Sequence, residues 1–359
     1  MTVFPADNRL EIRILTDADT GMWDDYVDSN VEARYSHLVA YRRVLQDVYR
    51  FQPHYTALFL DGRVKGILPA FVVGLPWARK CISVPFSQFG GPIIDILEEG
   101  MPQVVERMAA EAVVGTKSRR IEMRGLVEGI PSLQGAIIST TRTYDYAVLD
   151  LDVSESELFS GRFEHSVRKA IHKAEREDVS SVEDSTSSCI ERYFYPLYLR
   201  TMKRLGTPPH PIDFFLSLRY HFADRMKIFW AVYRGKYVSG LLGISTAKRV
   251  NILYIVSDER FRDVRPNDVV HWAYIQWARR NGYRCFDFGV ARYDGQRQFK
   301  RKWGTTFHPY RILRFDERGV KEFPGKASSH KLLVDIWKYM VPLKATAVLG
   351  KHLRRIYAQ

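Results

Sequence analysis

The chain has 359 residues, of which 46% are hydrophobic and 13% aromatic, so a single average domain and a disordered chain are both excluded. Lys and Arg number 54 against 41 Asp and Glu, a formal net charge of +13. This excess favours an anionic partner, such as RNA, a nucleotide, a phosphorylated carrier or an anionic membrane face.

The first half of the chain predicts a helix, a hairpin and three further elements. Residues 35–49 place apolar side chains on one helical face, and residues 54–73 read as two strands around an Asp-Gly turn. Residues 90–96 and 119–125 then have strand patterns on either side of a helical pattern at residues 102–115. The predicted order is therefore helix, antiparallel hairpin, strand, helix, strand.

The second half repeats this order. Residues 191–206 predict a helix that stops at a glycine, and residues 226–246 predict a second hairpin around an Arg-Gly turn. A strand pattern at 250–257, a helical pattern at 266–282 and a strand pattern at 283–289 follow. The late helix of each half begins with proline, which is common in the first turn of a helix.

The repeat predicts an α/β (α+β) protein with two tandem domains, each a mixed sheet flanked by helices. We expect an N-terminal domain at residues 1–155 and a C-terminal domain at residues 156–325. Residues 326–359 have the pattern of a basic amphipathic helix, broken at Pro342. Such a helix either lies on an anionic membrane surface or packs on the sheet of the second domain.

Cysteine and hydropathy patterns narrow the class of protein further. The three cysteines, Cys81, Cys189 and Cys285, form no CxxC pattern, so neither a metal site nor a disulfide framework is predicted. Residues 1–17 lack the apolar core of a secretory signal, and no window reaches ~18 apolar residues, the length that spans a membrane. We expect a cytoplasmic protein, with a peripheral position at the inner membrane face as an alternative.

Several motifs, together with this element order, resemble the FemAB family of tandem-GNAT transferases. The motifs are VRKAIHKAERE (167–177), LRTMKRLGTPPHP (199–211), RPNDVVHW (265–272), FDFG (286–289) and FKRKWG (299–304), with support from VPFSQFGGPIID (84–95). The resemblance spans about residues 30–315 and is more specific in the second half.

The resemblance implies an N-acyltransferase of the cell envelope or of exopolysaccharide synthesis. The donor would be an aminoacyl-tRNA or an acyl thioester of coenzyme A or of an acyl carrier protein, and the acceptor an amine of an envelope or polysaccharide precursor. No bound cofactor and no metal are expected. The rival hypothesis is a non-catalytic GNAT-derived module that binds RNA or an anionic membrane surface.

One segment departs from the ordinary GNAT pattern. Coenzyme A is usually held by a Gly-rich loop whose amides meet the phosphates at a helix N-terminus. Here SDERFRDVRPND (257–268) contains no glycine, and Pro266 lacks an amide donor. We predict that Arg262, Arg265, Asn267 and Lys302 bind the donor phosphate instead, the arginines through charge-assisted bonds.

A basic helix is predicted at residues 163–178. Val167, Ala170, Ile171 and Ala174 form its buried stripe, and cations cover much of the rest. The candidate phosphate-binding residues are Arg168, Lys169, Lys173 and Arg176. The alternative is an ordinary solvated face, with Glu175 and Glu177 offsetting part of the charge.

The segment FDFGVARYDGQRQFKRKWGT (286–305) is the candidate catalytic region. A strand ends there at Gly289 and leads into a cationic segment that we expect to be a loop. Lys300 is predicted to stabilise the oxyanion of the tetrahedral intermediate, as the resemblance implies for a lysine in this stretch, with Lys302 as the fallback. Asp287 is either a general base or, as we favour, an ion-pair partner of Arg292 or Lys300.

Four residues are candidates for the acceptor cleft. His210 lies in the proline-rich segment 206–211, and Tyr254 lies on the strand before the Arg262 segment. Ser87 and Gln88 lie beside two glycines in the first half, where a backbone can approach a ligand closely. A structural role is an alternative for His210 and Tyr254.

Overall fold

The computed structural model describes residues 10–74, 79–95, 101–126, 138–316 and 330–357. Residue 96, at the end of a predicted strand, and residues 326–329, at the start of the predicted tail, lie outside these ranges. The chain divides into two compact units, and it passes between them within β7 (Ile138–Asp150), within β13 (Thr306–Asp316), after residue 323 and near the end of α11 (Leu343–Tyr357).

The first unit contains the predicted hairpin and the elements around it. Its helices are α1 (Thr20–Ser29), α2 (Val39–Tyr49) and α3 (Met101–Gly115). Its strands are β1 (Leu10–Ile14), β2 (Gln52–Leu60), β3 (Arg63–Val73), β4 (Lys80–Ile82), β5 (Ile93–Ile94) and β6 (Arg120–Leu126). The strand order is β1-β2-β3-β4-β6-β13, with β5 beside β3.

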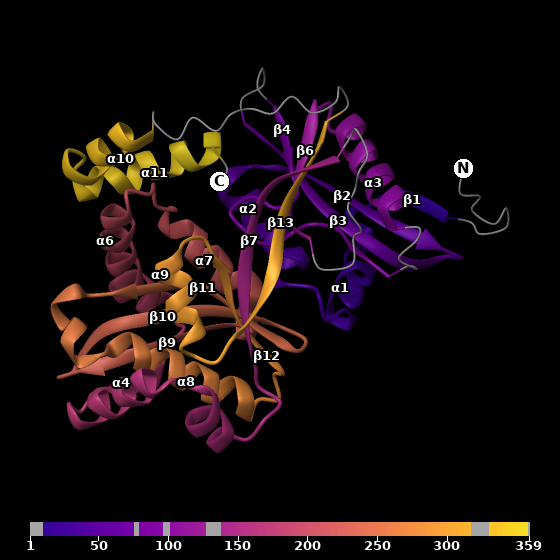
Figure 1. Ribbon diagram of the computed structural model, residues 1–359. Helices are drawn as coiled ribbons and strands as arrows, with labels where there is room; N and C mark the ends of the chain where they lie inside the picture. Colours follow the sequence, from indigo (N-terminus) through magenta and orange to yellow (C-terminus); the bar gives the residue numbers. More distant parts are fainter. Residues whose placement is uncertain (1–9, 75–78, 96–100, 127–137, 317–329, 358–359) are drawn as a thin grey trace. The chain divides into compact units, whose positions relative to one another are not determined.

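The second unit contains a sheet in the order β7-β12-β11-β10-β9-β8 (Figure 1). Its strands after β7 are β8 (Ser180–Glu183), β9 (Met226–Tyr233), β10 (Lys236–Thr246), β11 (Arg249–Ser257) and β12 (Cys285–Ala291). Its main helices are α4 (His165–Arg176), α6 (Tyr195–Leu205), α7 (Ile212–Phe222), α8 (Pro266–Arg280), α9 (Asp294–Arg301), α10 (His330–Tyr339) and α11 (Leu343–Tyr357).

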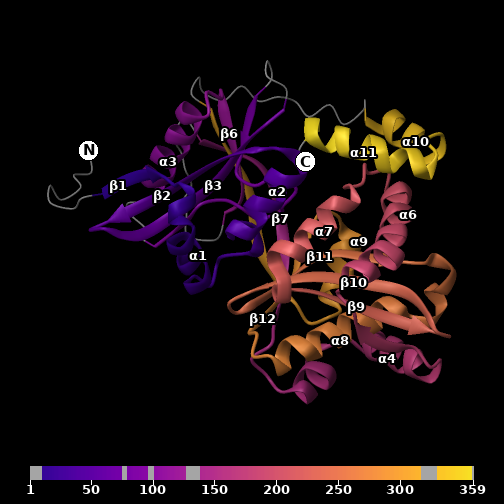
Figure 2. The same cartoon turned by 180° about the vertical axis from the view of Figure 1, so that it is seen from behind.

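Helices cover both faces of this second sheet (Figures 1 and 2). Neighbouring side chains of a strand point to opposite faces, so Phe229 contacts Tyr274 of α8 while Trp230 contacts Phe194 on the α6 side. The core on the α8 face also contains the stripe of α4, as its helical periodicity predicts. A mixed sheet flanked by helices is thus confirmed.

Both hairpins lie where the sequence predicts them, but the helices predicted before them are not uniform α-helices: the first is interrupted and the second changes its helix type. The predicted helix 35–49 is a 3₁₀ turn at Tyr35–His37 followed by α2, because Leu38 between them is extended. The predicted helix 191–206 begins as a π-helical turn at Ile190–Phe194 and continues as α6. Periodicity locates the buried face of a segment but does not report such breaks.

The two C-terminal helices dock on the end of α6 and on the proline-rich segment after it. Gly206 ends α6 with a φ of 70°, and a Cβ there would lie 2.5 Å from Val334 of α10. Arg354 of α11 donates through Nε to the carbonyl of Pro208 at 2.8 Å, and Lys203 donates to the carbonyl of Val341. One side of the helix pair is therefore held by the second unit.

Replacing Gly206 with alanine should loosen this contact. Gly206→Ala and Gly235→Ala both place a side chain at a φ near 70°, which costs about 1–2 kcal/mol. A Cβ at Gly235 meets no atom within 4 Å, whereas one at Gly206 overlaps Val334 and Lys338. Chemical denaturation should therefore show Gly206→Ala losing about 1–3 kcal/mol more than Gly235→Ala. Equal losses would mean that α10 does not pack tightly on Gly206.

Candidate functional site

Strands β11 and β12 separate soon after they meet. They run parallel and pair only from Arg249–Asn251 on one strand to Cys285–Asp287 on the other. Each strand then continues for several residues without further pairing to the other among the described residues. The carboxyl ends of two parallel strands therefore diverge, which is a common position for a ligand in an α/β protein.

The corresponding place in the first unit is occupied by its own chain. Strands β4 and β6 also pair in parallel for a short stretch. Beyond it, the amide of Ser83 donates to the carbonyl of Glu122, and the amide of Arg124 donates to Ser83 Oγ. The amide of Gly91 donates to the carbonyl of Arg124 at 2.7 Å. These bonds close the edge of β6 that would otherwise face a ligand.

Lys300 lies at the diverging end of β12. Its side chain comes from α9, and Nζ donates to the carbonyls of Gly289 at 2.7 Å and Val290 at 2.8 Å. The residue is 8% exposed, and burial lowers the pKa of its ammonium to about 8. The Asp287 carboxylate opposes this shift, while Arg292 adds to it.

The prediction that Lys300 lies in a loop is wrong. Asp294 in the first turn and Lys300 and Arg301 in the last turn of α9 complement the helix dipole and favour a helix there. Because α9 is helical, Lys300 has a fixed anchor rather than a mobile one. Gly289, at a φ of 73°, follows an irregularity in the pairing of β12 with β7 and brings its carbonyl within reach of Nζ.

Asp287 is buried beside Lys300 and has a structural partner that the sequence did not reveal. Its Oδ1 accepts the amide of Gly289 at 2.8 Å, and its Oδ2 lies 3.4 Å from Nη1 of Arg249. Arg249 is 38 residues away in the sequence, so no local pattern linked the two. The carboxylate thus both shapes the irregular end of β12 and balances a buried guanidinium.

His271 is a second residue near Lys300 that the sequence did not single out. Its Nδ1 lies 2.7 Å from the carbonyl of Asn267, and its ring stacks on Phe288 at 5.5 Å and contacts Trp303 at 5.3 Å. Burial lowers the pKa of His271 to about 4, and the Lys300 cation adds to the shift. The imidazole is therefore neutral at physiological pH.

One of the predicted phosphate-binding residues at the start of α8, Arg265, lies near a carboxylate, that of Asp268. Arg262 and Arg265 are exposed, and Asn267 Oδ1 accepts from Ser239 Oγ at 2.7 Å. Burial raises the pKa of Asp268, in the first turn of α8, to about 6, against the attraction of Arg265 and Lys302. An ionised Asp268 competes with any phosphate for this helix N-terminus.

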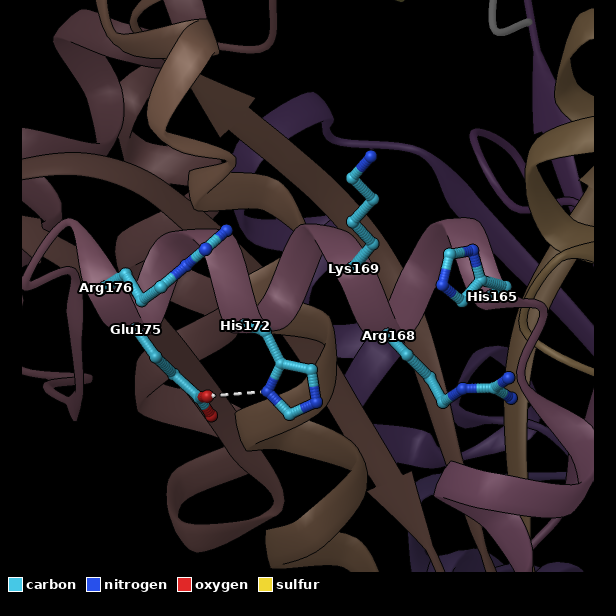
Figure 3. Close-up of a pocket in the computed structure, with 6 residues that line it drawn as sticks. All are labelled: His165, Arg168, Lys169, His172, Glu175 and Arg176. Atoms are coloured by element: carbon cyan, nitrogen blue, oxygen red, sulfur yellow. Dashed lines mark hydrogen bonds and ion pairs between the residues drawn. The ribbon is translucent and has the colours of Figure 1, made fainter.

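On the basic face of α4, Arg168 is hydrogen-bonded to the protein backbone, whereas Lys169 and Arg176 are exposed to solvent. Arg168 donates through Nη1 to the carbonyls of Ser160 and Phe163 and so ties α4 to the π-helical turn Glu157–Arg162. Lys173 is half-buried. Figure 3 shows the side chain of Lys169 extending away from the helix.

A hollow of about 780 Å³ lies along this face. It is lined by His165, Arg168, Lys169, His172, Glu175 and Arg176, and His172 Nδ1 lies 3.0 Å from Glu175 Oε2 (Figure 3). All six lining residues come from one helix, so the hollow is a surface on which an extended anion can lie rather than an enclosed pocket.

The candidate acceptor residues lie in two different units. In the second unit, Tyr254 contacts Tyr198 and His210 within an aromatic cluster. Burial, together with the Arg354 cation, lowers the pKa of His210 well below its usual range. In the first unit, Ser87 Oγ accepts the amide of Phe89 at 3.2 Å, and the carbonyl of Gln88 accepts from the hydroxyl of Tyr310.

The described part of the chain contains no cluster of three or more His, Cys, Asp or Glu that could hold a metal ion. Within the same ranges, no helix combines the length and the hydrophobicity needed to cross a bilayer.

Comparison with known proteins identifies the fold. Residues 161–301 match the family model described as an acetyltransferase (GNAT) domain. FemX has 15% identity and a TM-score of 0.67, over 84% of this chain and 96% of that chain. A tandem GNAT protein from the clavulanic acid biosynthesis pathway has 13% identity and a TM-score of 0.54, over 88% of this chain and 100% of that chain. The chain has a FemAB-like tandem-GNAT fold.

A third solved structure has a similar fold. It is the C-terminal domain (DUF2156) of a putative lysylphosphatidylglycerol synthetase from Agrobacterium fabrum, with 15% identity and a TM-score of 0.58 over 95% of this chain and 98% of that chain. None of the curated proteins matches the sequence.

The matched GNAT domain contains the diverging strands, Lys300, His271 and the basic helix α4. The expected FemAB-like tandem-GNAT fold and the expected enzyme class, acyltransferase, are confirmed. Within this domain the structure places Lys300 beside Asp287 and Arg265 beside Asp268, and Lys302, which directly follows the matched residues, is also close to Asp268. Tyr254 and His210 lie together in the aromatic cluster, whereas Ser87 and Gln88 belong to the other unit.

The divided basic face of α4 leads to a test. Arg168→Met should lower the free energy of unfolding by about 1–2 kcal/mol, because its carbonyl partners lose a charged donor. Lys169→Met and Arg176→Met should change stability by about 0.5 kcal/mol or less, as exposed substitutions do, yet weaken binding to tRNA or heparin. Urea denaturation and salt-dependent binding measure the two effects. An unchanged free energy of unfolding in Arg168→Met would show that the contacts of Arg168 with these carbonyls do not contribute to stability.

Proposed function

We propose that the chain transfers an acyl or aminoacyl group from an activated donor to an amine of a cell-envelope or exopolysaccharide precursor. In this reaction the amine nitrogen attacks the carbonyl carbon, and a tetrahedral intermediate forms. The bond to the donor oxygen or sulfur then breaks, the nitrogen loses a proton, and the leaving oxygen or sulfur gains one, so that an amide and a free hydroxyl or thiol result. The observation that carries the proposal is the buried Lys300 ammonium at the diverging end of β12 in a GNAT domain.

Lys300 is suited to stabilise the oxyanion of that intermediate. An ammonium has three N–H donors, and the carbonyls of Gly289 and Val290 accept two of them. In this proposal the third N–H donates to the oxyanion of the intermediate. Because the residue is largely buried, its charge is screened less than it would be in water, and the interaction strengthens as negative charge develops.

Asp287 then acts as a positioning residue rather than as the base. Its Oδ1 accepts from the amide of Gly289, and its Oδ2 lies against the guanidinium of Arg249. Both contacts hold the end of β12 in the shape that presents its carbonyls to Lys300. The carboxylate also opposes the loss of the lysine proton.

The basic residues favour aminoacyl-tRNA as the donor over a coenzyme A thioester. A coenzyme A pyrophosphate would meet the carboxylate of Asp268 at the start of α8, where ordinary GNAT enzymes present amides. An RNA backbone is extended and can instead follow Lys169 and Arg176 on the exposed face of α4. An acyl carrier protein remains the alternative source of a thioester.

Substitution of Lys300 tests the chemistry. Lys300→Met should lower turnover by about a hundredfold or more with donor binding nearly unchanged, because the lost contact acts mainly in the transition state. Lys300→Arg should restore little, since a planar guanidinium cannot replace a point charge held by two carbonyls. Single-turnover kinetics and donor-binding assays separate the two effects. If Lys300→Met bound the donor weakly but had normal turnover at saturating donor, Lys300 would bind the substrate rather than stabilise the transition state.

Asp287→Asn serves as the companion variant. It keeps the size of the side chain but leaves Arg249 with a neutral partner, so stability should fall by about 3–5 kcal/mol, as for a broken buried ion pair. Turnover of the folded fraction should stay within about tenfold of the wild type, the size of a modest positioning effect. A loss as large as that of Lys300→Met in fully folded protein would make Asp287 the general base.

The pKa of Lys300 predicts a pH dependence with a definite sign. Its ammonium is charged below about pH 8 and loses its proton above it. The ratio of wild-type to Lys300→Met turnover cancels the ionisation of the acceptor amine, so this ratio should be constant below pH 7 and fall as pH rises through about 8. A ratio that rises through the same range would show that the neutral lysine is the active form, as a base.

A further inference from the structure

The two C-terminal helices expose apolar side chains at unusual density. Sixteen large hydrophobic residues in the described ranges are exposed, and six of them lie in residues 330–357, less than a tenth of the chain. They are Ile336, Tyr339, Met340, Val348, Leu349 and Ile356. Single exposed hydrophobic residues are normal on a protein surface, but a local concentration of this kind marks an interaction site.

Helical spacing places these residues on the outer sides of the two helices. Ile336, Tyr339 and Met340 follow the i, i+3, i+4 pattern, so they share one face of α10 and its C-terminal end. The opposite side of α10 packs on Gly206 through Val334 and Lys338. Tyr339 and Met340, at the turn between the helices, are 82% and 74% exposed.

The outer side of α11 has the same character. Val348 and Leu349 are exposed, while Gly350 packs on Pro209 and Thr346 is buried. The docked side of the pair also contains apolar side chains, since Val334 packs on Gly206 and Trp337 is buried. The pair therefore has large apolar side chains on its outer side in addition to its docked side, whereas an ordinary surface helix has a single apolar stripe that faces the core.

The charge of the segment complements an anionic surface. Residues 330–357 contain six Lys and Arg against one acid, Asp335. Three of the six, Lys338, Lys351 and Arg354, contact Gly206, Asp213 and Pro208 of the second unit. Each remaining Lys or Arg that comes near an anionic bilayer contributes on the order of 1 kcal/mol of attraction. A helix pair with large apolar side chains and a basic composition has the features of a segment that lies in the membrane interface.

We propose that the α10–α11 pair docks on an anionic lipid bilayer, with Tyr339 and Met340 entering the headgroup region. The helices have 10 and 15 residues, which correspond to about 15 and 22 Å, too short to span a hydrocarbon core of about 30 Å. The pair therefore lies on the bilayer and does not cross it. Bilayer docking goes beyond acyl transfer and does not depend on it.

Vesicle flotation with the full chain tests this interaction. The wild type should float with phosphatidylcholine vesicles that contain about 30% of the anionic lipid phosphatidylglycerol. It should float less with phosphatidylcholine alone or at high salt. The double variant Tyr339→Ser/Met340→Ser should bind anionic vesicles at least tenfold more weakly, which corresponds to about 1.4 kcal/mol.

Tyr220→Ser is the matched control, because Tyr220 on α7 is 80% exposed and lies outside the helix pair. It should bind vesicles like the wild type, and circular dichroism should show all three proteins equally folded. Lack of wild-type binding to anionic vesicles, or equal loss in the control, would overturn the proposal. So would a dimer in light scattering that the double variant dissociates while vesicle binding persists, because the occupant would then be a second copy of the chain.

Discussion

The burial of one ammonium group constrains much of the second unit. Lys300 can remain charged in a largely apolar setting only because two backbone carbonyls accept from it and a carboxylate lies nearby. Those carbonyls are available because β12 is irregular at Gly289, and Asp287 holds that irregularity through the glycine amide. Arg249 in turn balances Asp287. A charge at the strand end thus depends on a chain of contacts that begins on the neighbouring strand.

The aromatic residues around His271 serve the same arrangement. Phe288 and Trp303 exclude water from one side of the strand end, and Phe163 packs on Trp303 from the segment before α4. The carbonyl of Lys302 accepts the amide of Glu164, so the start of α4 is tied to the end of α9. The basic helix and the catalytic candidate are therefore parts of one local structure, which explains why their motifs belong to the same matched domain.

Local patterns in the sequence predicted the architecture well and the site only in part. The hairpins β2-β3 and β9-β10 could be recognised because alternating apolar strands and a two-residue turn are adjacent in the chain. The α4 stripe followed from spacing alone. The contact of Asp287 with Arg249, in contrast, joins residues far apart in the sequence. The raised pKa of Asp268 results from burial, which the spacing of residues in the sequence does not reveal. Lys300 was singled out by resemblance and by its cationic surroundings, but its helical anchor needed the structure.

The closed edge of β6 in the first unit has a consequence for redesign. Two of the three contacts that close this edge are between backbone groups, because the amides of Ser83 and Gly91 donate to the carbonyls of Glu122 and Arg124. The amide of Arg124 donates to a side chain, Ser83 Oγ, so trimming Ser83 would remove that contact and leave the two backbone contacts in place. Building a second copy of the candidate site in the first unit would require removal and replacement of the whole Ser83–Gly91 segment. Point substitutions alone would not be enough.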